Sequence, residues 1–158
     1  MAVWSFPVCM TYAALRDMFS FTIPNWIPLV LICGYFIATI AQDNFWTYET
    51  LSNTSTSVSV LIVAAILFYL GLLGGGDAKL LAAASIWMGW TALVPFLLFI
   101  SLSGGFLALV WLLAKRLVGS KVLPSRAKRY FNSNHGVPYG IAIAIGSLIV
   151  FFTRDWVQ

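Results

Sequence analysis

The chain has 158 residues, of which 61% are apolar and only 9% are charged, and its formal net charge is +4. This composition excludes a water-soluble globular domain and predicts an integral membrane protein. At roughly 20 residues for each membrane-spanning helix, the length accommodates about six spans in a single membrane domain over residues 1–158.

Apolar runs without alternating polarity predict helices, because lipid leaves only helices and closed barrels as spanning structures. The first helix ends near Phe19. We interpret it as a retained helix, because it has no basic start and no small-residue cleavage site precedes Asp17. The fold class predicted is an all-α, polytopic bundle of about six transmembrane helices. The other five are predicted over Asn25–Ala41, Val58–Leu73, Ala78–Trp90, Pro95–Leu113 and Tyr139–Phe152.

A basic run joins the fifth and sixth predicted helices and, by the positive-inside rule, is predicted to be cytoplasmic. Counting spans back from it places both termini outside, on the periplasmic side, and the turns with Asp17 and Asp77 on the cytoplasmic side. The loop over residues 42–57 contains no Lys or Arg, which suits an outside location. Few aromatic residues interleave with the basic ones, which argues against nucleic-acid binding. The basic residues are Lys115, Arg116, Lys121, Arg126, Lys128 and Arg129.

Asp17 and Asp77 are acids beside or within long apolar segments, and an acid at membrane depth is a candidate functional residue. If the helices that carry them are neighbours, the two carboxyl groups share one site. Two close carboxylates do not both ionise cheaply, so one holds a proton while the other stays charged. The pair suits amide hydrolysis, in which the ionised acid deprotonates water and the protonated acid polarises the scissile carbonyl.

The remaining reactive side chains predict no metal site and no cofactor. Cys9 and Cys33 lie in apolar helical stretches without CxxC spacing and are interpreted as packing residues. His135 is the single histidine of the sequence and lies in the basic loop, where a solvated residue is expected. This inventory does not provide the ligands of a zinc site.

Four sequence features together resemble the prepilin peptidases, also called type IV leader peptidases, and most closely their short tight-adherence (Flp) pilus branch. These features are Asp17, the run Ile23-Pro24-Asn25, the run from Gly74 to Lys79, and Pro138-Tyr139-Gly140. The family comprises intramembrane aspartic proteases with a GxGD motif, which Gly74, Gly76 and Asp77 match here. The resemblance implies Asp17 and Asp77 as the catalytic pair.

The resemblance also implies the substrate and the location. The expected partner is a prepilin or pseudopilin whose short basic leader stays in the cytoplasm while its apolar helix lies in the bilayer. Cleavage is expected after a glycine of the leader, at the cytoplasmic face of a bacterial inner membrane that the enzyme crosses several times. A pilus-assembly machine is a further expected partner.

Residues around Asp77 have two interpretations each. Gly74 and Gly76 would let the enzyme backbone lie against an extended substrate, or they form a tight helix-to-helix turn. Lys79 would bias Asp77 towards ionisation, or it extends to the membrane interface.

Two further groups of residues are predicted to support the site. Pro24 is expected to start the second helix, where Asn25 would hydrogen-bond exposed backbone. Pro138, Tyr139 and Gly140 begin the last helix on the same side and are expected to wall the site. Tyr139 could equally be an interfacial anchor.

Longer members of the family carry a cytoplasmic domain with paired CxxC motifs, which is associated with N-methylation of the new pilin terminus. Nothing in this sequence corresponds to it, so we expect peptidase activity without methyltransferase activity, S-adenosylmethionine or zinc. A proton-coupled small transporter or channel is the alternative, since paired intramembrane acids also relay ions. Transporter sites, however, gather near the bilayer midplane. A non-enzymatic pilus-assembly membrane protein is a third possibility.

Overall fold

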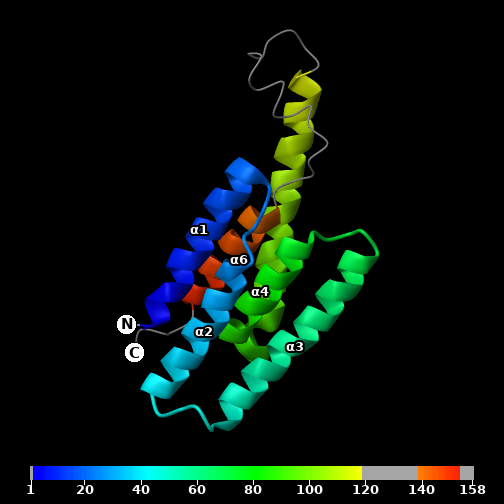
Figure 1. The fold of residues 1–158 in the computed structure, drawn as a ribbon. Coiled ribbons are helices and arrows are strands. Elements are labelled where there is room, and N and C mark those ends of the chain that lie inside the picture. The colour runs from blue at the N-terminus through cyan, green and yellow to red at the C-terminus, as the bar shows by residue number, and fades with distance from the viewer. Residues whose placement is uncertain (1, 119–138, 154–158) are drawn as a thin grey trace.

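The computed structural model describes residues 2–118 and 139–153, and every regular element in those ranges is helical. A short 3-10 helix, Ala2–Trp4, precedes the α-helices, which Figure 1 shows as a bundle. The long α4 packs against α3 and α6, while α1 contacts α6 and α2. The all-α fold class is therefore confirmed. The α-helices are α1 (Ser5–Ser20), α2 (Trp26–Ala41), α3 (Tyr48–Tyr69), α4 (Gly75–Val118) and α6 (Tyr139–Thr153).

Two helices of the described residues are long and apolar enough to cross a membrane. They are Tyr48–Tyr69 and the part of α4 from Gly75 to Ala114. The helices Trp26–Ala41 and Tyr139–Thr153 are apolar but shorter. These findings agree with a membrane protein.

The structure assigns one helix, α4, to the region in which the sequence predicts the fourth and fifth helices. Within residues 2–118 and 139–153 it has five α-helices, because α4 covers both the predicted fourth and fifth helices. The break expected between Trp90 and Pro95 is present but lies at Gly89, which is non-helical with φ 64° and ψ 179°, while Pro95 lies inside the helix. Only glycine adopts this conformation readily. A Cβ at Gly89 would also collide with Oδ1 of Asn53.

The chain changes direction within the green part of α4, as Figure 1 shows, and the non-helical residue of this helix is Gly89. Contacts at the start of α6 require this reversal. Gly104, beyond the break, lies against Tyr139, while Asp77, before the break, interacts with Asp17, which hydrogen-bonds Gly140. The two segments of α4 therefore run in opposite directions.

The third helix begins ten residues earlier than predicted, at Tyr48 instead of Val58. Its Ser- and Thr-rich first half was expected to be a loop. Instead, the Thr47 hydroxyl caps the helix by accepting a hydrogen bond from the Thr50 N–H. Hydroxyl groups within the helix bond to backbone carbonyls one turn earlier, as Thr54 does to Thr50. These local bonds satisfy polar side chains without ending the helix.

Trp87 is the largest fully buried side chain and lies at the centre of the core. Its Nε1 donates a hydrogen bond to the Leu31 carbonyl oxygen at 3.0 Å, linking α4 to α2. Its ring lies 5.3 Å from that of Phe6 in α1 and 5.6 Å from that of Tyr35 in α2. The core thus fixes α1, α2 and the first segment of α4 relative to one another, and these are the elements that carry the two acids.

Candidate active site

Asp17 and Asp77 lie close enough for their carboxyl groups to interact electrostatically. Asp17 lies in the last turn of α1, which ends where Phe21 takes a left-handed conformation and donates its N–H to the Asp17 carbonyl at 2.9 Å. Asp77 lies in the first turn of α4. The Asp17 side chain is buried and the Asp77 side chain is half-buried. Two acids from distant parts of the sequence thus meet at one end of the bundle, as helix parity predicts.

The start of α6 holds the Asp17 carboxyl group. The Gly140 N–H donates a 2.7 Å hydrogen bond to Asp17 Oδ2. The first N–H groups of a helix have no intrahelical acceptor, so Asp17 caps α6. A Cβ on Gly140 would lie 2.8 Å from Asp17 Oδ2 and 2.9 Å from its Cγ. A glycine at position 140 therefore allows the carboxylate to approach.

The glycines before Asp77 leave space that the protein's own side chains fill. A Cβ on Gly74 would lie 2.7 Å from Asp77 Oδ2, and a Cβ on Gly76 would lie 3.2 Å from the Ile23 Cβ. The Gly74 carbonyl accepts the Ala78 N–H at 2.9 Å, which begins the helical bonding of α4. The glycine run is therefore a tight helix start. Its contact with an extended substrate stays a prediction.

The connection between α1 and α2 contacts α4 through Asn25. Oδ1 of Asn25 accepts a 3.0 Å hydrogen bond from Lys79 Nζ, and both side chains are exposed. The predicted bond from Asn25 to exposed backbone is wrong, since its side chain makes no cap bond. Pro24 does not start the second helix, which begins at Trp26. In the part of the chain that the structure describes, Lys79 forms no ion pair with Asp77.

Tyr139 is the first residue of α6 and is 41% exposed. Its ring packs beside Gly104 of α4, where a Cβ would lie 3.6 Å from Tyr139 Cε1. Tyr139 therefore lies between α6 and α4 with one side still accessible, and its role as a wall of the site stays a prediction. Pro138 and the predicted basic loop from Lys121 to Arg129 lie outside the described residues.

Ile23 is a residue at this site that the sequence analysis did not select. Its side chain contacts both Gly76 and Gly140, which are the neighbours of the two acids. The sequence feature that could have identified it as a site residue is its position in the run Ile23-Pro24-Asn25. The sequence does not show, however, that a side chain between two helices fills the space beside both glycines.

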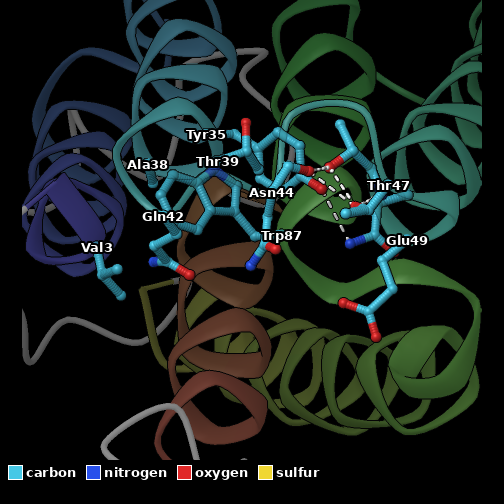
Figure 2. Close-up of a pocket in the computed structure, with 11 residues that line it drawn as sticks. Val3, Tyr35, Ala38, Thr39, Gln42, Asn44, Thr47, Glu49 and Trp87 are labelled. Carbon is cyan, nitrogen blue, oxygen red and sulfur yellow. Dashed lines mark hydrogen bonds between the residues drawn. The ribbon is translucent and has the colours of Figure 1, made fainter.

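A polar cavity lies at the other end of the bundle, between the end of α2 and the start of α3 (Figure 2). Its volume is about 80 Å³, which suffices for a few water molecules. Asn53 donates a 3.0 Å hydrogen bond to the Tyr35 hydroxyl there, and Glu49 is the acidic residue of its lining. A single acid among amide and hydroxyl groups does not form a proton-sharing pair. The end with Asp17 and Asp77 is therefore the candidate active site.

Comparisons with known proteins show the family of this chain. A model of the type IV leader peptidase family matches residues 4–109, a range that includes both acids. An 80-residue segment is 35% identical to the prepilin leader peptidase/N-methyltransferase of Xanthomonas campestris pv. campestris and covers 51% of this chain and 23% of that protein. An alignment over 76 residues shows 38% identity to the protein of the same name from Pectobacterium carotovorum subsp. carotovorum. It covers 39% of this chain and 27% of that protein. The matched segments thus span about a quarter of these relatives. No solved structure matches.

Proposed function

Because the chain belongs to the type IV leader peptidase family, we propose that it is an intramembrane aspartic endopeptidase that removes the leader of type IV prepilins. The observation that carries this proposal is the meeting of Asp17 and Asp77 at one end of the bundle. Two neighbouring carboxyl groups supply the acid and the base for attack of water on an amide, and no covalent nucleophile is required.

The surroundings of the two acids support a division of roles. Asp17 accepts a hydrogen bond from the Gly140 N–H at the start of α6, which stabilises its charged form. Asp77 lies in the first turn of α4, where the helix dipole also favours a negative charge. The dipole contributes about 0.3–1 kcal/mol, whereas each hydrogen bond to a charged group contributes about 1.5–3 kcal/mol. We therefore assign Asp17 as the ionised base and Asp77 as the protonated acid.

In this assignment the Asp17 carboxylate takes a proton from water as the water attacks the scissile carbonyl carbon. The Asp77 carboxyl group donates a hydrogen bond to the carbonyl oxygen, which gains negative charge. The proton held by Asp17 then passes to the leaving nitrogen, and the peptide bond breaks. The products are the leader with a new carboxylate and the pilin with a new amino terminus.

We place this end of the bundle at the cytoplasmic face of the bacterial inner membrane, in a multi-pass protein with both termini outside. The protein then has six spans, because the two segments of α4 on either side of Gly89 count separately. The second segment of α4 supports this orientation, because it passes the site at Trp111 and continues to Lys115 and Arg116. The Trp111 ring lies 5.9 Å from that of Phe21, just after α1. Basic residues at a helix end are typical of the cytoplasmic side.

The proposed substrates are prepilins and pseudopilins of the Flp type, cleaved after a glycine of the leader. The names of the two relatives support prepilins as the substrate class. The finer assignment to the Flp branch comes from the resemblance of the motifs. We also propose that residues 1–158 form one membrane-embedded peptidase domain without methyltransferase activity.

A coexpression experiment tests the proposed activity. A Flp-type prepilin is expressed with the wild-type protein, with Asp17→Asn or with Asp77→Asn, and its size is followed on a gel. The wild type should shorten the prepilin, and both variants should leave it intact while they accumulate in the membrane to the same level. Leader removal by both variants would exclude the acid pair as the catalytic centre.

A further inference from the structure

Ile23 lies in the short connection between α1 and α2 and is next to both Gly76 of α4 and Gly140 of α6. Its Cβ is 3.2 Å from the position that a Cβ on Gly76 would take, and its backbone N and O are both 3.6 Å from it. In the other direction, its Cδ1 is 2.9 Å from the position of a Cβ on Gly140. A single side chain therefore occupies the space beside both glycines.

Each glycine is directly coupled to one acid. Gly76 is the residue before Asp77, and Gly140 donates its N–H to Asp17. Ile23 consequently lies between the start of α4, which carries Asp77, and the start of α6, which holds Asp17. Any change in the volume of this side chain alters the distance between the start of α4 and the start of α6.

The connection that carries Ile23 is fixed on both sides of it. Before Ile23, the ring of Phe21 packs edge-on against Trp111 of α4. After Ile23, Asn25 accepts the hydrogen bond from Lys79, also of α4. Ile23 itself packs against the buried core. Both segments of α4 thus hold the connection on either side of Ile23, and the core holds its side chain. Ile23 is therefore a rigid spacer.

We propose that Ile23 is a positioning residue that sets the separation of the Asp17 and Asp77 carboxyl groups. The inference rests on the proposed function, since the distance matters for catalysis only if the acids act as a pair. The shape of isoleucine suits this role. The Cβ faces Gly76 and Cδ1 reaches Gly140, so valine would keep the first contact and lose the second.

Two sets of variants test the proposal in protein reconstituted in lipid vesicles. Ile23→Val and Ile23→Ala shorten the spacer in two steps. Ile37→Val and Ile37→Ala are the matched controls, because Ile37 in α2 is 59% exposed and lies towards the other end of that helix. Cleavage of a purified prepilin gives kcat and KM for each variant.

We expect kcat to fall by about a hundredfold in Ile23→Ala, with a smaller loss in Ile23→Val and little change in KM, because a displacement of about 1 Å costs this much in rate. The Ile37 variants should match the wild type. Equal kcat in wild type and both Ile23 variants would overturn the proposal.

Crosslinking supplies a readout that does not depend on peptidase activity. Asp17→Cys and Asp77→Cys are combined with Cys9→Ser and Cys33→Ser, and the pair is bridged with bifunctional thiosulfonates of increasing length. With Ile23 present, one narrow range of lengths should react best, and Ile23→Ala should broaden or shift that range. An unchanged length profile in both Ile23 variants would overturn the spacer role. If Ile23→Ala changes the profile but the wild-type protein with Asp17 and Asp77 cleaves no prepilin, the proposed function is contradicted and the spacer role stands.

Discussion

Substitution of Gly140 by alanine should damage catalysis, because it disturbs the Asp17 carboxylate. The new Cβ would lie 2.8 Å from Asp17 Oδ2 and 2.9 Å from Ile23 Cδ1, so the carboxylate must move away and its 2.7 Å bond from the Gly140 N–H must lengthen or break. A hydrogen bond to a charged group contributes about 1.5–3 kcal/mol, and 1.36 kcal/mol corresponds to a tenfold change in rate, so kcat/KM should fall by about 10- to 160-fold.

Gly105→Ala is the matched control for this variant. Gly105 is also a helical glycine near the site, but a Cβ there would have no neighbour within 4 Å. It should therefore cleave prepilin at the wild-type rate and unfold in detergent at or above the wild-type temperature, because alanine favours helices by about 1 kcal/mol over glycine. Gly140→Ala should instead unfold below the wild-type temperature, because the weakened hydrogen bond to the buried carboxylate outweighs that gain. Wild-type kcat/KM in Gly140→Ala would refute the reasoning that this glycine admits the Asp17 carboxylate.

Two further predictions concern residues around the site. Lys79→Ala and Asn25→Ala should each lower kcat/KM by less than about tenfold, because one exposed hydrogen bond contributes about 0.5–1.5 kcal/mol. The double variant should be no worse than either single one, and additive losses would show that the two side chains act separately. Gly89→Ala should lower the free energy of unfolding by about 1–3 kcal/mol, because alanine is strained at φ 64° and its Cβ would collide with Asn53. Thermal unfolding followed by tryptophan fluorescence measures this loss, and an unchanged midpoint would contradict the assigned role of Gly89.

The sequence was sufficient to predict the helical fold class and the end of the bundle at which Asp17 and Asp77 meet. Both follow from properties of single segments: apolar length gives the helices, and the number of helices between two residues gives their side. The cap of α6 by Asp17 was not predicted, because the first N–H groups of that helix have no sequence signal for their acceptor. The role of Ile23 was not predicted either, because its contacts join three segments of the chain.

The errors in helix boundaries have equally local causes. Pro95 suggested a helix start, yet the break occurs at Gly89. Asn53 of α3 lies so close to Gly89 that a Cβ there would collide with it. The Ser and Thr residues before Val58 suggested a loop, but their hydroxyl groups bond to the helix's own carbonyls. Backbone conformation at these positions depends on hydrogen bonds and contacts that hydropathy does not report.

The most direct measurement is cleavage of a purified Flp-type prepilin by the purified protein in lipid vesicles, with the products identified by mass spectrometry. We predict that the wild-type protein releases a leader that ends in glycine, and that Asp17→Asn and Asp77→Asn each release none. Release of the same leader by either variant at the wild-type rate would contradict the central claim that the two acids form the catalytic pair.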